Sequence, residues 1–259
     1  IANRLDLKGT NCVVDAACAS SLSAVHLAAL EWNAGKSDVV LTGGVDAFND
    51  IFMYMCFSKT QALSAAGDAR PFSASADGTV VGEGVGIVVL KRLADAERDG
   101  DRIYAVLRGM GTSSDGKSQS IYAPRAAGQA EALRAAYASA GVIPDQVQLV
   151  EAHGTGTKVG DVVEFEALET VYRESQSNGA WCALGSVKSQ IGHTKAAAGA
   201  ASLIKADAPN PKMDLAGSPF YLNTRTAAGK PRAGGSSFGF GGSNFHAVLE
   251  EYPAARATD

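Results

Sequence analysis

The chain has 259 residues, 46% of them hydrophobic and 19% charged, a composition typical of folded globular proteins and not of disordered or fibrous ones. Its 23 Lys and Arg residues against 27 Asp and Glu residues give a net charge of -4, which argues against a nucleic-acid-binding surface. There is no membrane-length apolar run, no signal-peptide pattern and no metal-type spacing among the four cysteines, so we expect a cytoplasmic protein with reduced thiols.

Strand-like and helix-like runs alternate along the chain, which is the pattern of an α/β layered fold. The strand-like runs are residues 12–16, 39–44, 86–93, 103–111 and 147–154. The helix-like runs are residues 20–32, 128–141, 161–174 and 195–205. In the third of these helices Phe165, Leu168 and Tyr172 fall on one face, as a half-buried helix requires. Residues 207–235 are rich in Pro, Gly and Asn, which predicts mostly loop or extended chain.

Cys18 lies where the first strand-like run meets the first helix-like run. A thiol at a helix N-terminus experiences the positive end of the macrodipole and free backbone N–H groups, and both favour the thiolate. The small neighbours Ala16, Ala17 and Ala19 leave room for a substrate carbonyl to approach the sulfur. The position therefore suits a nucleophile, although a buried structural cysteine is an equally open interpretation.

His153 follows a strand-like run in the segment VEAHGTGTKVGDVVE. The Gly- and Thr-rich loop would expose its imidazole at the end of the strand, while Thr155 and Thr157 offer hydroxyls to a polar ligand arm. The alternative is a loop histidine whose ring is satisfied by backbone groups. Asp161 and Glu164 have the spacing of a capping box ahead of an apolar run.

Lys188 and His193 lie in LGSVKSQIGHTKAAAGAASLIK, between a strand-like run and a helix with small side chains. Such a helix packs closely and is more often core than surface, so His193 is predicted at a buried helix start with Thr194 as N-cap. For Lys188 taken alone, a solvated surface lysine is the alternative interpretation.

The segment GGSSFGFGGSNFHAVLEEY predicts a Gly-rich loop before a strand. A phosphate-binding loop is excluded, because the P-loop lysine and the GxGxxG-to-helix context are both absent. The glycines around Phe238 and Phe240 suit a turn that presents a backbone N–H, with a phenyl ring able to swing over a cavity. His246 lies in the following strand and is predicted to be structural.

Four motifs, in this order, resemble those of β-ketoacyl synthases of the type I polyketide and polyunsaturated fatty acid synthase kind: DAACASS, EAHGTGT, GSVKSQIGHTKAAAG and SSFGFGGSNFHAVLEE. The resemblance covers the whole chain and implies a thiolase-like layered fold whose N-terminal half is largely missing. Residues 1–259 are therefore expected to be one partial ketosynthase domain, and the chain part of a longer protein. The family usually has longer segments after Lys205 and after Thr226.

The resemblance also implies a role for each candidate residue. Cys18 would take the acyl chain from the phosphopantetheine thiol of an acyl carrier protein. His153 and His193 would bind the malonyl thioester carbonyl and promote decarboxylation. Lys188 would lie beside the histidines and pair with Glu164.

The remaining candidates would bind or support the substrates. The backbone N–H groups of Cys18 and Phe240 would form an oxyanion hole, and Phe240 would also be the gating aromatic. Thr155 and Thr157 would line the pantetheine tunnel, with Asp161 in a supporting position. The resemblance implies no metal and no nucleotide cofactor.

The expected reaction is a decarboxylative Claisen condensation of a Cys18-bound acyl chain with malonyl-acyl carrier protein, which would extend a fatty acid or polyketide. A non-catalytic, truncated ketosynthase remnant or scaffold is one alternative, and a thiolase, which condenses without decarboxylation, is another. A Cys-His peptidase would leave Lys188 and the Gly-Phe motif without a role. Residues 12–16 resemble a dimer-edge strand, so a homodimer is expected when the domain is complete. Acyl carrier protein and acyl and malonyl thioesters are the expected partners.

Overall fold

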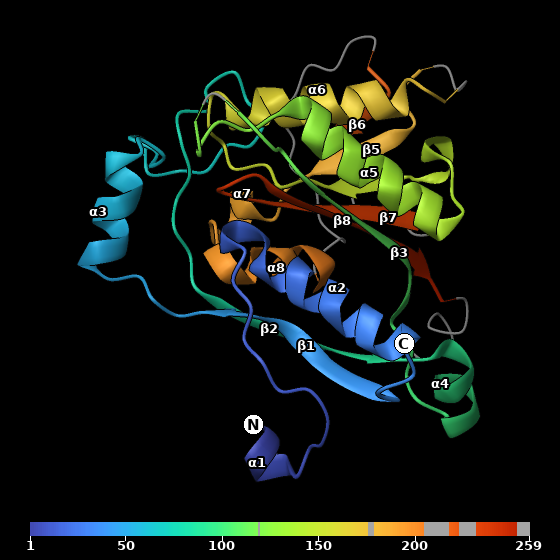
Figure 1. Cartoon of the computed structure of the whole chain (residues 1–259). Helices are drawn as coiled ribbons and strands as arrows, with labels where there is room; N and C mark the ends of the chain where they lie inside the picture. Colours follow the sequence, from blue (N-terminus) through green and yellow to red (C-terminus); the bar gives the residue numbers. More distant parts are fainter. Residues whose placement is uncertain (119, 176–178, 205–217, 223–231, 253–259) are drawn as a thin grey trace.

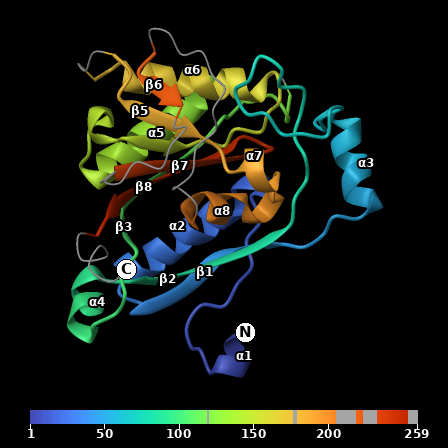
Figure 2. The same cartoon turned by 180° about the vertical axis from the view of Figure 1, so that it is seen from behind.

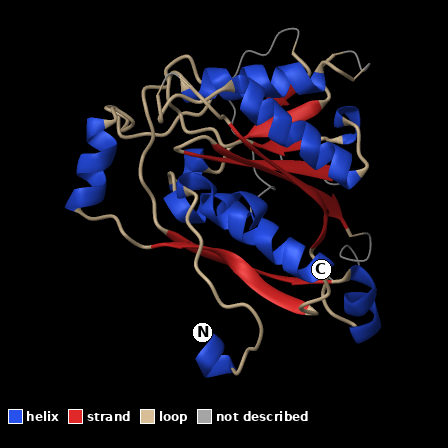
Figure 3. Cartoon of the chain, in the orientation of Figure 1, coloured by secondary structure: helices blue, strands red, loops and turns tan. Residues whose placement is uncertain are grey.

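The computed structural model describes all residues except 119, 176–178, 205–217, 223–231 and 253–259. Its helices and strands stack in alternating layers (Figures 1 and 3). A six-stranded sheet lies between two pairs of helices, and a separate two-stranded sheet lies beyond one of these pairs. The alternating pattern of the sequence is thus realised as the predicted α/β layered fold.

The six-stranded sheet is mixed, with strand order β3-β8-β7-β4-β5-β6. The β3–β8 and β8–β7 pairs are antiparallel, whereas β7–β4, β4–β5 and β5–β6 are parallel. The strands are β3 (Ala105–Ser114), β4 (Leu149–Glu151), β5 (Cys182–Gly185), β6 (Phe220–Leu222), β7 (Arg232–Gly239) and β8 (Ser243–Glu251). All residues of β4 and β5 are buried, as expected for parallel strands covered on both faces.

Two helices cover each face of this sheet (Figures 1 and 2). On one face lie α5 (Ala126–Ala140) and α6 (Gly160–Tyr172), and on the other lie α2 (Ser20–Asn33) and α8 (Ala198–Ile204). The main core forms between α5, α6 and the sheet. Leu168 and Tyr172 are buried there and Phe165 packs against them, which confirms the predicted buried face of α6.

The two-stranded sheet consists of β1 (Val39–Asp46) and β2 (Gly84–Lys91), paired antiparallel against α2 and α8. Apolar side chains that alternate along these strands are exposed, namely Val39, Leu41, Val45, Val85, Ile87 and Val89. The shorter elements are α1 (Ala2–Leu5), η1 (Ala17–Ala19), α3 (Ile51–Lys59), α4 (Leu93–Asp99), η2 (Pro144–Gln146), α7 (Lys188–Ile191) and η3 (Lys195–Ala197). Among the described residues, no helix combines the length and apolar character needed to cross a bilayer.

Two local predictions are wrong, and a third holds only in part. Residues 12–16 form no strand, and Val13 is 98% exposed, because none of the described residues supplies a neighbouring strand for a hydrogen-bond ladder. The SSFG part of the predicted Gly-rich loop belongs to β7, which pairs with β8 in a hairpin. Thr194 is the N-cap residue of η3, as predicted, although its side chain makes no capping hydrogen bond.

His246 has the structural role predicted for it. It is fully buried in β8, and its Nδ1 lies 2.9 Å from Ser236 Oγ while its Nε2 lies 3.1 Å from the Tyr137 hydroxyl. The prediction for residues 207–235 lies outside the described residues except near its end, where β6 and the first residues of β7 are strands. The shortened segments after Lys205 and Thr226 also lie outside the described residues.

Candidate active site

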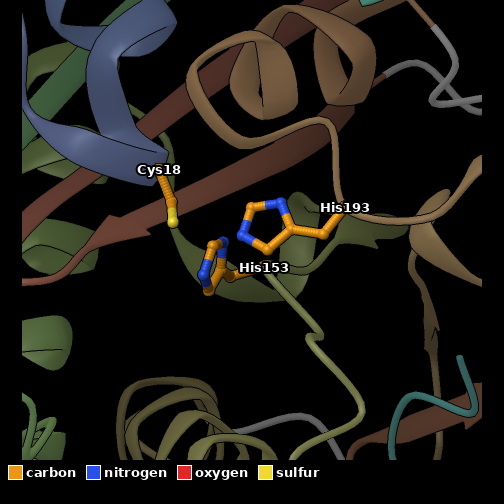
Figure 4. Close-up of side chains that lie close together, drawn as sticks. All are labelled: Cys18, His153 and His193. Atoms are coloured by element: carbon orange, nitrogen blue, oxygen red, sulfur yellow. The ribbon is translucent and has the colours of Figure 1, made fainter. Parts of the chain in front are cut away.

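Three side chains from separate parts of the chain meet at one cavity (Figure 4). The Cys18 sulfur and one ring nitrogen each of His153 and His193 all lie within 4.8 Å of one another. The two imidazole rings are 5.4 Å apart between centroids and nearly perpendicular, at 85°. The cavity that they line has a volume of about 610 Å³. The sequence-predicted nucleophile and histidines are therefore neighbours in space.

Cys18 sits on a sharp turn between extended chain and α2. Ala17 has a left-handed backbone with φ of 49°, an uncommon conformation for a residue with a Cβ. One local and one long-range hydrogen bond hold this turn. The Ala17 N–H donates to Asp15 Oδ1 at 2.8 Å, and Ser237 Oγ, from β7, donates to the Cys18 carbonyl at 2.6 Å. The turn presents the thiol at the N-terminus of the helix, as the sequence predicted.

Gly239, at the end of β7, allows the strand to approach the Cys18 turn. A Cβ at this position would lie 2.2 Å from the Ala16 carbonyl oxygen, well inside contact distance. Gly235 in the same strand is a matched position, since a Cβ there would meet nothing within 4 Å.

We expect Gly239→Ala to slow acylation of Cys18 at least about tenfold, because relieving the clash must displace the turn that carries the thiol. Overpacking of this kind also lowers the free energy of unfolding by about 1–3 kcal/mol. Acyl transfer followed by intact-mass spectrometry and thermal melting measure the two effects. Gly235→Ala is the control and should leave both within experimental error, whereas equal behaviour of the two variants would contradict this account of Gly239.

Burial raises the pKa of Cys18 to about 11. The Lys188 ammonium and the backbone N–H groups of Cys18 and Phe240 act in the opposite direction, and Asp46 adds to the rise. The sequence predicts that the helix N-terminus favours the thiolate. The net shift of the Cys18 pKa is upward, so this prediction is wrong. Removing the sulfur from water costs more than the nearby dipoles and cation recover.

Alkylation of Cys18 by iodoacetamide should accordingly accelerate about tenfold per pH unit between pH 7 and 10, because only the thiolate attacks. The sign follows from the raised pKa: the thiol is protonated at pH 7, and each unit of pH multiplies its thiolate fraction. The measurement uses peptide mass spectrometry on a Cys12→Ser/Cys56→Ser background, which removes the two exposed cysteines. A rate that stays constant above pH 7 would contradict the raised pKa.

Burial favours the neutral form of both imidazoles at the cavity. Burial lowers the pKa of His153 and of His193 well below the usual range, and Lys188 lowers both further. Nδ1 of His193 accepts the Lys195 N–H at 3.1 Å, so the proton of this ring lies on Nε2. Nε2 of His193 and Nδ1 of His153 are buried and have no hydrogen-bond partner among the described residues. The cavity thus holds a free N–H donor on His193.

Lys188 is buried, with a side chain only 2% exposed, and is not a solvated surface lysine. Burial lowers its pKa, while the carboxylates of Glu151 and then Glu164 raise it. Glu164 thus acts electrostatically on Lys188, but the predicted pairing is not a hydrogen-bonded contact, because Nζ has no hydrogen-bond partner among the described residues. Glu164 instead accepts the N–H groups of His153 and Gly154, each at 2.7 Å. It therefore positions the backbone that carries His153.

The capping-box interpretation of Asp161 and Glu164 is also wrong. The helix N-cap is Val159, which makes no side-chain capping bond. Asp161 accepts the N–H groups of Gly156 at 3.0 Å and Phe72 at 2.5 Å, which ties the loop after β4 to a distant segment. Burial raises the pKa of Asp161 to about 6, and burial together with the Asp161 charge raises that of Glu164 to about 7.

Phe240 and the two threonines line the same cavity as Cys18. The backbone N–H of Phe240 and that of Cys18 both act on the Cys18 sulfur, an arrangement that suits an oxyanion hole. The Phe240 ring is 46% exposed and packs edge-on against Tyr122 at 5.6 Å. Thr155 Oγ1 and Thr157 Oγ1 lie 2.9 Å apart at the cavity wall.

Several residues of the site were missed by the sequence reasoning. Glu151 is 2% exposed, and its Oε1 accepts the Val187 N–H at 2.6 Å just before Lys188. Its position two residues before His153, as the first residue of EAHGTGT and the last of a buried strand, was a usable signal. Phe57 packs edge-on to His193 at 6.5 Å, and Tyr122 packs against Phe240. No local pattern in the sequence places either aromatic residue at the cavity.

A thiolate and two imidazoles are also ligands that zinc binds. Here a cation would lie close to Lys188, which acts electrostatically on Cys18, His153 and His193 alike. A bound metal would also use the Cys18 sulfur as a ligand. This is the sulfur on which the backbone N–H groups of Cys18 and Phe240 act. The arrangement is better suited to acyl transfer, with the thiol as nucleophile and N–H donors on two sides of the cavity.

Two family models match the sequence. The model described as "Beta-ketoacyl synthase, N-terminal domain" matches residues 1–96, and that described as "Beta-ketoacyl synthase, C-terminal domain" matches residues 104–207. The chain is 47% identical to a polyunsaturated fatty acid synthase subunit from a Thraustochytrium species, over 96% of this chain and 10% of that protein. It is 45% identical to a phenolphthiocerol/phthiocerol polyketide synthase subunit from Mycobacterium tuberculosis, over 98% of this chain and 15% of that protein.

Solved structures agree with these matches. The ketosynthase from module 6 of the bacillaene synthase of Bacillus subtilis superimposes with a TM-score of 0.91 and 42% identity. The superposition covers 98% of this chain and 50% of that one. The oxazolomycin ketosynthase domain from Streptomyces albus also gives a TM-score of 0.91, with 36% identity. The thiolase-like layered fold expected from the sequence is confirmed, and the chain spans about half the length of these solved ketosynthases.

Proposed function

Because the chain belongs to the β-ketoacyl synthase family, we propose that it catalyses a decarboxylative Claisen condensation between a Cys18-bound acyl chain and malonyl-acyl carrier protein. The observation that carries the proposal is the meeting of Cys18, His153 and His193 within 4.8 Å at one cavity. The product would be an extended fatty acid or polyketide chain, as in the polyunsaturated fatty acid and polyketide synthases to which the chain is similar.

In the first half-reaction the Cys18 sulfur attacks the carbonyl carbon of the acyl thioester. The new carbon–sulfur bond forms as the bond to the carrier thiol breaks, and the thiol proton passes from Cys18 to the departing carrier thiolate. The N–H groups of Cys18 and Phe240 stabilise the negative oxygen of the tetrahedral intermediate. Because Nε2 of His193 already carries a proton, this ring acts as a donor and not as the acceptor of the thiol proton.

In the second half-reaction the malonyl thioester loses carbon dioxide and becomes an enolate. The developing charge on the enolate oxygen is stabilised by N–H donors of His193 and His153, which are held in place before the reaction begins. Burial favours the neutral form of both rings, and a neutral imidazole still carries one N–H that can donate a hydrogen bond to the enolate oxygen.

The enolate carbon then attacks the Cys18 thioester. A carbon–carbon bond forms, the carbon–sulfur bond to Cys18 breaks, and uptake of one proton restores the thiol. The overall step converts acyl-Cys18, malonyl carrier and a proton into β-ketoacyl carrier, carbon dioxide and free Cys18. Every group in this sequence is a side chain, a backbone N–H or a substrate, so we propose that no metal or nucleotide cofactor takes part.

The proposal includes partners and location. An acyl carrier protein would present both substrates on its phosphopantetheine arm, with Thr155 and Thr157 along the arm's path. A homodimer would form in the complete domain. No disulfide joins any of the four cysteines, all of which lie among the described residues, and this supports a reducing compartment such as the cytoplasm.

A non-catalytic remnant or scaffold of ketosynthase type is the second candidate; the chain covers about half of the solved ketosynthase chain. The test incubates the protein with an acyl thioester donor and malonyl-acyl carrier protein labelled in the free carboxyl. We expect a β-ketoacyl carrier two carbons longer than the donor and equimolar labelled carbon dioxide. The same product from acetyl-acyl carrier protein would instead indicate a thiolase, and a folded protein inactive with both would indicate the remnant.

A further inference from the structure

Lys195 combines a strained backbone with a buried charged side chain, two positions after His193. Its φ is 47°, in the left-handed region that residues with a Cβ rarely adopt. This conformation directs the Lys195 N–H at Nδ1 of His193, 3.1 Å away. The orientation of one backbone N–H therefore decides which nitrogen of His193 carries the proton.

The side chain of Lys195 holds the same backbone in place through the contacts of its Nζ. Its Nζ lies 3.0 Å from Asp46 Oδ1 and donates to Asn49 Oδ1 at 2.5 Å and to the Gly82 carbonyl at 2.8 Å. The side chains of Lys195 and Asp46 are only 6% and 12% exposed, so solvent screens this ion pair little. Left-handed residues with a Cβ persist where the surrounding contacts hold them in place, as they do here.

The same contacts enclose His193. Asp46 Oδ2 accepts the N–H of Ala196, the residue after Lys195, at 3.3 Å. The His193 carbonyl accepts the Gly82 N–H at 2.9 Å, and the His193 N–H donates to the Val80 carbonyl at 2.7 Å. The end of β1, the segment before β2 and the start of η3 thus form one connected network around the histidine.

Asp46 also acts on the nucleophile. The charged or titratable groups that face Cys18 are Lys188 from α7, Asp46 from the end of β1, and the imidazoles of His153 and His193. Asp46 disfavours the thiolate, and Lys188 favours it. Asp46 carries its own counter-ion, the Lys195 ammonium 3.0 Å from its Oδ1, and η3, which supplies this lysine, packs against η1, which carries Cys18.

We infer that Lys195 and Asp46 are a positioning pair for both halves of the reaction: the ion pair holds the backbone N–H that fixes the His193 tautomer, and it cancels charge beside Cys18. The inference rests on the proposed function for its catalytic meaning. Neither residue touches substrate in this account, and each acts through His193 or Cys18.

The first test reads the tautomer directly. The chain has only four histidines, so ¹⁵N-histidine labelling gives an assignable NMR spectrum at pH 7. In the unmodified protein His193 should show a protonated Nε2 and an unprotonated Nδ1. Lys195→Met keeps the length of the side chain but removes its charge and donors, and should convert this signal to a mixture of tautomers. The exposed Lys59→Met variant is the matched control and should leave the spectrum unchanged.

The second test separates charge from general damage to the fold. At pH 8.5, Lys195→Met should slow iodoacetamide alkylation of Cys18 about threefold, because Asp46 is left uncompensated, whereas Asp46→Asn should accelerate it about threefold. The double variant should return to the original rate. A merely structural effect would move both single variants in the same direction.

Two outcomes would overturn the inference: a His193 spectrum unaltered in Lys195→Met, or alkylation rates that shift in the same direction in both single variants. If Lys195→Met does not fold, the isosteric Asp46→Asn carries the alkylation test alone, and an unchanged rate overturns the charge role. Neither readout requires turnover, so they are independent of whether condensation is observed. With turnover, carbon dioxide release by Lys195→Met should fall about tenfold or more.

Discussion

Cys18→Ala should abolish formation of the acyl-enzyme: intact-mass spectrometry after incubation with an acyl thioester should show no added acyl mass. Loss of a covalent nucleophile removes a whole reaction path, so condensation should fall by about 10⁴-fold or more. The alanine side chain offers no nucleophile in place of the thiol. Small as the change is, it eliminates the first half-reaction entirely.

The matched control for this variant is Cys12→Ala, which alters an exposed cysteine six positions earlier in the chain. It should accept the acyl group at the unmodified rate. Acyl mass retained by Cys18→Ala, or lost from Cys12→Ala, would show that another thiol is the acceptor and would remove Cys18 from the mechanism.

His193→Ala should separate the two half-reactions. Acylation of Cys18 should persist, because the oxyanion donors for that step are the backbone N–H groups of Cys18 and Phe240. Release of carbon dioxide from malonyl carrier should fall by about 10²–10³-fold, the usual cost of losing one preorganised donor to a developing oxyanion. Acyl mass on the protein and labelled carbon dioxide, measured in the same sample, give the two rates.

Retained acylation in His193→Ala also reports an intact fold, since the same cavity must be formed for Cys18 to react. His26→Ala, which changes a histidine outside this cavity, should leave both rates unaltered. Normal decarboxylation in His193→Ala would exclude this ring as the enolate donor, and loss of acylation would show that the two half-reactions share it.

The sequence was sufficient to predict which residues meet at the site. Cys18 and His153 each follow a strand-like run of the sequence, and His193 follows a glycine, so all three lie in small-residue turns that local pattern captures. The resemblance to ketosynthases then brought the separate motifs into one cavity, which the structure also shows. Buried strands and amphipathic helices were also predictable from their periodicity, as the Leu168 and Tyr172 face of α6 illustrates.

The predictions that are wrong depend on contacts between residues far apart in the sequence, which no local pattern records. Residues 12–16 have the composition of a strand, yet a strand requires a partner, and none of the described residues supplies one. The Asp161 and Glu164 spacing fits a capping box, but tertiary contacts direct both carboxylates at the N–H groups of the loop after β4 and of Phe72. The thiol pKa rises because burial, which sequence does not quantify, outweighs the helix terminus.

The positioning pair was missed for a related reason. Asp46 and Lys195 are separated by most of the chain, and neither stands in a motif that predicts an ion pair. A left-handed backbone at a lysine also runs against residue preference, so no turn rule would place one there. The end of β1 and η3 come into contact only in the folded protein, where the layers of sheet and helix stack.

The most direct test of the whole account follows the mass of the protein through one turnover. The protein is first acylated, freed of donor, and then mixed with malonyl-acyl carrier protein. The account predicts that the acyl mass leaves the Cys18 peptide at the same rate as β-ketoacyl carrier and carbon dioxide appear, in equal amounts. Carbon dioxide released while the acyl group remains on Cys18, or condensation product formed with no acyl-Cys18 intermediate, would contradict it.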